Sequence, residues 1–258
     1  MSLAFAERPA AIADQAGARW RPSPNFGTRY DGKTIDAIVL HYTGMASGDG
    51  AEDWLCNPKS GVSSHYLVHE DGEIVQMVRE TDRAWHAGIG CWYGERDMNS
   101  VSIGIEIVNA GHREWTVDRE TSLDPFPEVQ VNAVIGLCSG IMDRWTIAPE
   151  RVLGHSDLAP HRKRDPGEAF PWDRLCEHDI GLCVDAAPLG EGEPLPVMQL
   201  QTMLRDVGFD IAPSGEYCAH TEMTVRAFQR HWRREKVDGL ADGSTCETLR
   251  RLREIAVG

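Results

Sequence analysis

The chain has 258 residues, 41% of them hydrophobic and 26% charged, which is enough to bury a core in one large domain or two smaller ones. Asp and Glu total 40 against 26 Lys and Arg, and the formal charge of −14 argues against nucleic acid or an anionic membrane surface as a partner. No segment approaches the roughly 18 consecutive apolar residues of a membrane-spanning helix, so we expect no membrane span.

Residues 1–34 are polar and contain several Pro and Gly, which predicts an irregular N-terminal extension. The apolar residues 35–42 then predict an inner strand, and residues 51–56 a short helix. Residues 63–78 predict a hairpin, because an Asp-Gly turn at 71–72 separates two strand-like segments.

The next segments complete a mixed pattern of strands and helices. Residues 101–108 alternate, with Val101 and three isoleucines on one face and Glu106 on the other. Residues 128–145 have helical spacing, and residues 151–153 predict one more short strand. The pattern predicts an α/β domain over residues 35–183, with a central mixed sheet flanked by helices.

A second, smaller unit follows a linker. Residues 184–196 are rich in Pro, Gly and Glu, which is typical of a linker. Residues 197–258 contain three apolar stripes at helical spacing and predict a small independent three-helix domain. Ser244 and Glu247 have the spacing of a capping box, which predicts the start of the third helix.

Two histidines and one aspartate are candidate metal ligands. His41 closes the first buried strand, His155 follows the strand at 151–153, and Asp165 lies ten residues beyond His155. Two imidazoles and one carboxylate suit a catalytic zinc site with an open position for water. By spacing alone this signal is weak, and spacing favours the alternative that His41 is a hydrogen-bonded core histidine and Asp165 a turn residue.

Four further residues are candidates for chemistry or binding. Glu106 is a carboxylate in an apolar strand, so it either faces solvent or lines a cleft, where burial would raise its pKa and favour a general base. Lys163 is either one member of a basic cluster or a cation that stabilises an oxyanion. Trp85 and His86 form either a wall of a binding groove or a packed corner of the fold.

Six ordered segments carry a family resemblance. They are residues 38–43 (IVLHYT), 64–68 (SHYLV), 84–88 (AWHAG), 102–107 (SIGIEI), 152–157 (VLGHSD) and 163–167 (KRDPG). Together they resemble the zinc-dependent N-acetylmuramoyl-L-alanine amidases of the type 2 family, which share a fold with peptidoglycan recognition proteins. Residues 197–201 (VMQLQ), 227–230 (AFQR) and 237–239 (VDG) resemble a three-helix peptidoglycan-binding domain.

The resemblance implies a role for each candidate. It implies that His41, His155 and Asp165 hold zinc. Glu106 matches the catalytic carboxylate and Lys163 the cation beside the metal. The implied reaction is hydrolysis of the amide between the lactyl group of N-acetylmuramic acid and L-alanine, in peptidoglycan or its anhydro-muropeptide fragments. The alternative is a recognition protein of the same fold that binds wall peptides without cutting them.

The compartment is a separate expectation. The N-terminus lacks the basic and long apolar segments of a secretory signal, and the seven cysteines are scattered, which favours buried thiols in the cytoplasm. One disulfide, for example Cys176–Cys183, is compatible with the sequence. A wall-binding domain instead suggests the periplasm, so that alternative stays open.

Overall fold

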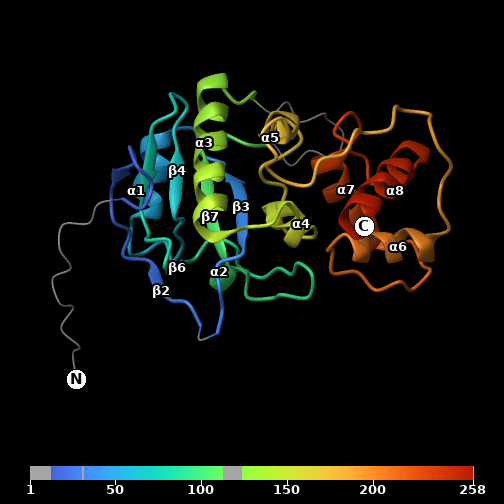
Figure 1. Cartoon of the computed structure of the whole chain (residues 1–258), viewed down its shortest axis with the longest axis horizontal. Helices are drawn as coiled ribbons and strands as arrows, with labels where there is room; N and C mark the ends of the chain where they lie inside the picture. Colours follow the sequence, from blue (N-terminus) through green and yellow to red (C-terminus); the bar gives the residue numbers. More distant parts are fainter. Residues whose placement is uncertain (1–12, 31, 113–123, 258) are drawn as a thin grey trace.

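A six-stranded sheet with the order β1-β5-β4-β7-β3-β8 forms the centre of the larger domain (Figure 1). The computed structural model describes residues 13–30, 32–112 and 124–257, so the first 12 residues of the predicted extension lie outside it. Within these ranges, no helix has both the length and the hydropathy needed to cross a membrane.

The strands are β1 (Arg19–Trp20), β2 (Phe26–Thr28), β3 (Ala37–Tyr42), β4 (Tyr66–Val68), β5 (Ile74–Gln76), β6 (Asp82–Ala84), β7 (Ser102–Ile107) and β8 (Val152–Gly154). The helices are α1 (Gly48–Leu55), α2 (Met98–Val101), α3 (Glu128–Trp145), α4 (His155–Leu158), α5 (Trp172–Cys176), α6 (Val197–Asp206), α7 (Ala219–Trp232) and α8 (Gly243–Val257), with a 3-10 turn at Pro149–Arg151.

The predicted mixed sheet is confirmed. β3 lies between β7 and β8, and β7 between β3 and β4, with all of these neighbours parallel. β4 and β5 are antiparallel and form the predicted hairpin. The carboxyl ends of β3, β4, β7 and β8 therefore point to one edge of the sheet, where side chains from distant parts of the sequence can meet.

The alternation in β7 separates a structural face from a polar one. Ile103, Ile105 and Ile107 are fully buried and pack with the apolar stripe of α3. Val101 differs from the prediction, because it ends α2 and packs in another core cluster. Glu106 points to the face opposite α3, where α1 packs near β4 and β5.

Part of the predicted irregular extension belongs to the sheets. β1 pairs in parallel with β5 at one edge of the main sheet. β2 pairs with β6 in a separate two-stranded sheet. These strands have two and three residues, which is too short for an alternating pattern to predict them.

The three predicted C-terminal helices are α6, α7 and α8. The predicted Ser244–Glu247 capping box is wrong. Asp242 Oδ1 instead accepts a hydrogen bond from the Thr245 backbone N–H at 2.8 Å. The Ser244 hydroxyl donates to the Ala187 carbonyl, which ties α8 to the preceding linker.

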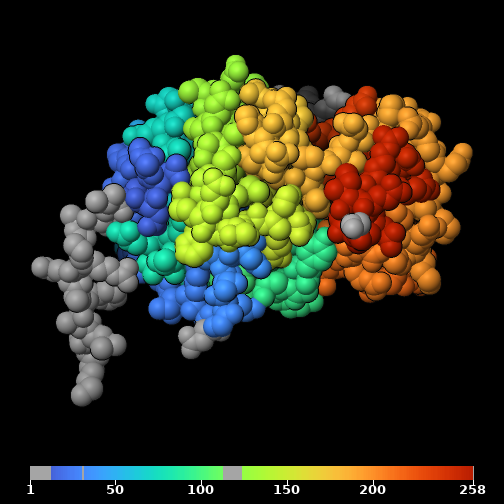
Figure 2. Space-filling view, viewed as in Figure 1, coloured from blue at the N-terminus to red at the C-terminus, as the bar shows by residue number. Residues whose placement is uncertain are grey.

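The helical module (residues 197–258) packs directly against the larger domain. Figures 1 and 2 show it side by side with the region of α4 and α5. One hydrophobic cluster contains β3 and β8 residues together with the cores of α6, α7 and α8. The indole of Trp92 is fully buried and packs edge-to-face on Phe209 of the module. The module is therefore continuous with the core of the larger domain. Nearby, Cys176 and Cys183 form a disulfide.

Candidate active site

His41 and Glu106 are neighbours across the centre of the sheet. They are register partners at the carboxyl ends of the parallel strands β3 and β7. His155 follows directly after β8, the strand on the other side of β3. The topology thus brings three candidates, separated by up to 114 residues, to the same edge.

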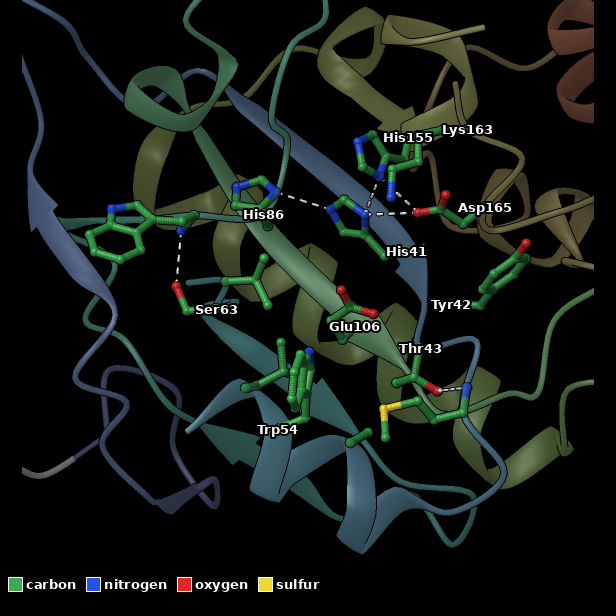
Figure 3. A pocket seen from close by; sticks show the side chains of 15 residues that line it. His41, Tyr42, Thr43, Trp54, Ser63, His86, Glu106, His155, Lys163 and Asp165 are labelled. Atoms are coloured by element: carbon green, nitrogen blue, oxygen red, sulfur yellow. Dashed lines mark hydrogen bonds and ion pairs between the residues drawn. The ribbon is translucent and has the colours of Figure 1, made fainter. Parts of the chain in front are cut away.

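His41, His155 and Asp165 converge on one centre (Figure 3). His41 Nδ1 and His155 Nδ1 lie 2.8 Å apart, and each lies 2.9 Å from Asp165 Oδ2. All three residues are buried, and in the described part of the chain they are the one group of its kind that could hold a metal ion. Two imidazole nitrogens and one carboxylate oxygen are the donor set of a catalytic zinc site, so these residues fit a zinc ion.

The environment favours the protonation states that a metal ion needs. Burial, followed by the neighbouring His155, lowers the pKa of His41 to about 4, although Asp165 acts in the opposite direction, and the low pKa favours the neutral imidazole. Burial alone would raise the pKa of Asp165. The two adjacent imidazoles outweigh that effect and hold this pKa well below its usual range. A neutral imidazole and an ionised carboxylate are the forms that ligate metals.

Glu106 lines the same pocket, which answers the question left open by its sequence position. Its Oε2 is buried, and no group in the described part of the chain hydrogen-bonds to it. Burial, followed by the charge of Asp165, raises the pKa of Glu106 to about 8. A buried carboxylate oxygen with unused acceptor capacity, beside a metal-ligand group, is suited to bind and deprotonate water.

Lys163 also borders the pocket, beside His155 and Asp165 (Figure 3). It lies in the loop between α4 and α5, where its backbone N–H donates to the Ala159 carbonyl. Its charge lowers the pKa of Glu106 and thus partly opposes the effect of burial there. The structure therefore places a cation and a carboxylate around the metal-ligand group.

The two predicted wall residues differ in position. Trp85 lines the pocket, and its backbone N–H donates to Ser63 Oγ. His86 borders the pocket but is largely buried, and its Nδ1 lies 3.0 Å from His41 Nε2. The sequence analysis missed Trp54 on α1, which lines the pocket and is 49% exposed. An exposed tryptophan on a short helix was the available signal. The remaining lining residues are Tyr42, Thr43, Met45, Ala51, Leu55, Val62 and Ser63.

Comparison with known families agrees with this arrangement. Residues 31–168 match the N-acetylmuramoyl-L-alanine amidase family, and residues 195–249 match the peptidoglycan binding domain family. The first match contains the candidate metal ligands, Glu106 and Lys163. The second covers most of the helical module.

Individual relatives match over most of their length. The N-acetylmuramoyl-L-alanine amidase AmiD of Escherichia coli is 35% identical over 82% of this chain and 79% of its own length. The 1,6-anhydro-N-acetylmuramyl-L-alanine amidase AmpD of Escherichia coli is 31% identical over 62% of this chain and 90% of its own length.

Solved structures extend the likeness to the whole fold. AmiD in complex with anhydro-N-acetylmuramic acid-L-Ala-D-gamma-Glu-L-Lys superposes with a TM-score of 0.78, at 33% identity over 88% of this chain and 92% of that one. AmpDh3 of Pseudomonas aeruginosa in complex with anhydromuramic pentapeptide gives a TM-score of 0.75, at 29% identity over 95% of this chain and 98% of that one. The chain therefore belongs to the N-acetylmuramoyl-L-alanine amidase family and is a hydrolase of that family.

Proposed function

We propose that the protein hydrolyses the amide bond between the lactyl group of N-acetylmuramic acid and L-alanine in anhydro-muropeptides, as part of peptidoglycan recycling. The observation that carries this proposal is the complete site, with three convergent ligand atoms and Glu106 in one pocket. The solved complexes of AmiD and AmpDh3 hold anhydromuramic peptides, which supports this substrate class. The complete site also favours an enzyme over a recognition protein that binds without cutting.

The metal in this proposal is zinc, held by His41, His155 and Asp165. Bound there, zinc would act as a Lewis acid toward the amide carbonyl and acidify the attacking water at neutral pH. Glu106 holds the water at its buried Oε2 and accepts the proton. The same carboxyl group then delivers this proton to the leaving amine of L-alanine, because an amine departs more readily than its anion.

Lys163 stabilises the negative charge that develops on the carbonyl oxygen. It borders the pocket beside the ligand group, where a donor can reach the attacked carbonyl. One well-placed donor to such an oxyanion contributes roughly 3–4 kcal/mol to the transition state. Trp54 and Trp85 offer aromatic surface to the sugar or the peptide, since both line the pocket.

Product analysis tests this proposal. Incubation with an anhydro-muropeptide should release the free peptide and anhydro-N-acetylmuramic acid, separated and identified by liquid chromatography and mass spectrometry. Removal of metal with a chelator should abolish cleavage, and added zinc should restore it. Binding of the muropeptide without cleavage, by protein containing zinc, would favour the recognition protein instead. Intact sacculi, run in parallel, show which form of substrate is preferred.

The compartment also belongs to the proposal. The sequence alone favours the cytoplasm, but the Cys176–Cys183 disulfide supports the periplasmic alternative, because disulfides persist in oxidising compartments. We propose that the protein works in the periplasm. Fractionation of the host cell with immunodetection tests this, and recovery in the cytoplasmic fraction alone would contradict it.

A further inference from the structure

The imidazole of His86 lies behind the metal-ligand group. His86 Nδ1 lies 3.0 Å from His41 Nε2, and the two rings meet edge-to-face at 83°. On its other side, His86 Nε2 lies 3.3 Å from Ser102 Oγ, and the Ser102 hydroxyl donates to the Met98 carbonyl. Since Ser102 Oγ uses its proton on Met98, it accepts from His86 Nε2–H. His86 Nδ1 is then an acceptor for the proton on His41 Nε2.

The next residue contacts the other histidine ligand. The Ala87 carbonyl accepts a hydrogen bond from His155 Nε2 at 2.8 Å and another from the Arg162 guanidinium at 2.8 Å. The backbone N–H groups of His86 and Ala87 both donate to Asn99 Oδ1, at 3.1 and 2.8 Å. One dipeptide, fixed by one asparagine, thus contacts the outer nitrogens of both histidine ligands.

The strand beneath leaves room for this arrangement. Gly104 lies on the polar face of β7, and a Cβ atom at this position would come within 2.4 Å of His86 Cγ. Any larger residue there would displace the His86 ring. Arg29 anchors the same region from the N-terminal segment, because its guanidinium donates to the Asn99 and Ser102 carbonyls.

We propose that His86 is a positioning residue for the metal centre. It accepts the Nε2 proton of His41, while the Ala87 carbonyl accepts that of His155. Both ligand rings are thereby held in the tautomer and orientation that present Nδ1 to the metal ion. This role differs from the substrate wall expected from the sequence, and it rests on the proposed zinc site. Hydrogen bonds to the outer nitrogen of a metal-bound imidazole typically fix its orientation and tune its affinity.

The test compares two substitutions at this position. His86→Leu removes the acceptor, whereas His86→Asn places an acceptor oxygen near the position of Nδ1. We expect His86→Leu to weaken zinc binding about 10- to 100-fold, which is typical when a hydrogen bond to a metal-bound imidazole is lost. We expect His86→Asn to retain most of the wild-type affinity. The measurements are the zinc Kd by chelator competition and the visible absorption spectrum of the cobalt-substituted protein, which reports ligand geometry.

A stability measurement and a control variant separate positioning from general stability. The thermal midpoint of each metal-free variant shows the structural cost of the substitution. His178→Leu, at an exposed histidine beyond α5, controls for loss of incidental zinc binding. If His86→Leu does not fold, Ser102→Ala decides the question. It removes the Oγ that accepts the hydrogen bond from His86 Nε2–H, and it should weaken zinc binding by a smaller factor.

The outcomes separate this inference from the proposed function. The inference fails if wild-type protein binds one zinc ion and His86→Leu binds it equally well with the same cobalt spectrum. It also fails if Leu and Asn at this position lose affinity equally and in proportion to their thermal stability, or if Ser102→Ala leaves the Kd unchanged. A wild-type protein without a zinc site would overturn the proposed zinc chemistry as well.

Discussion

His231 of the helical module forms a buried pair with Asp157 of the larger domain, with Nδ1 and Oδ2 2.8 Å apart and side chains 3% and 0% exposed. The imidazole stacks between Trp172 and Trp232, at ring-centroid distances of 3.6 and 3.7 Å. Asp157 Oδ2 also accepts the Gly154 backbone N–H, directly before His155 at the start of α4. The module is thereby joined to the segment that carries a candidate metal ligand.

We predict that His231→Ala destabilises the whole protein. Removing the imidazole takes away a buried hydrogen bond to the Asp157 carboxylate, which typically costs about 1.5–3 kcal/mol. Chemical denaturation followed by tryptophan fluorescence measures this as one cooperative transition, because both domains share a core. The control Met223→Ala, at an exposed position on the same helix, should change stability by less than about 0.5 kcal/mol. Two separate transitions in wild-type protein would show that the module folds independently.

The shared core also affects how truncations are interpreted. Removing residues 196–258 would expose Trp92 and Leu158, which are buried against the module. We therefore expect truncation to lower activity on small fragments as well as on polymeric wall. Loss on polymeric wall alone would contradict a supporting role for the module.

Glu106→Gln should separate metal binding from catalysis. The amide is close in size to the carboxylate but cannot accept a proton, so we expect kcat to fall about 10²- to 10⁴-fold while zinc content is retained. Steady-state kinetics on an anhydro-muropeptide, together with metal analysis, measures both quantities. Glu235→Gln, an exposed carboxylate of the module, is the matched control. Turnover near the wild-type rate in Glu106→Gln would mean that another group is the base.

Trp54→Ala should weaken substrate binding with little effect on the chemical step. The indole lines the pocket from α1 and is half exposed, and Figure 3 shows it apart from the ligand group. We expect KM to rise roughly 10-fold, equivalent to about 1.4 kcal/mol of lost binding free energy, with kcat nearly unchanged. Leu240→Ala, also at an exposed apolar position but in the module, controls for solubility effects. An unchanged KM would remove Trp54 from the binding site.

The sequence predicts the elements whose patterns are long. The helix over residues 128–145 has the bounds of α3, and the alternation at 102–107 gives the faces of β7, because a continuous apolar stripe must be buried. Such patterns do not predict how the module packs on the larger domain. An apolar stripe predicts that one face of α6 is buried but not what covers it. Phe209, just beyond that helix, packs on Trp92 from more than 100 residues away.

The site was predictable in composition but not in arrangement. Family resemblance identifies the candidate ligands, since spacing alone leaves them among ten histidines. The position of His86 depends on a ring orientation that no pattern encodes. The sequence holds one sign of this contact: a glycine in an isoleucine-rich strand, Gly104, indicates that another group approaches the strand closely, and that group is the His86 ring.

A network of charged side chains joins the N-terminal segment to α1. Glu52 on α1 accepts two hydrogen bonds from Arg19, each at 2.8 Å, and pairs with Arg21 and His69 at 2.9 and 3.1 Å. Its side chain is 3% exposed. The hydrogen bonds from Arg19 are the largest effect and lower the pKa of Glu52 to about 2, although burial acts in the opposite direction. This network attaches β1 to the larger domain.

Because the pKa of Glu52 is lower in the folded state than in the unfolded state, folding favours the ionised form. The resulting stabilisation is complete above the unfolded pKa of about 4.5 and is lost as the pH falls toward 2. We expect Glu52→Gln to lower the free energy of unfolding by about 2 kcal/mol at pH 7, with the difference from wild type shrinking below pH 4.5. Glu73→Gln, which removes a 46% exposed partner of Arg19, should have a much smaller effect. Urea denaturation from pH 3 to 7 measures this difference. A difference that does not change with pH would mean that Glu52 contributes through packing alone.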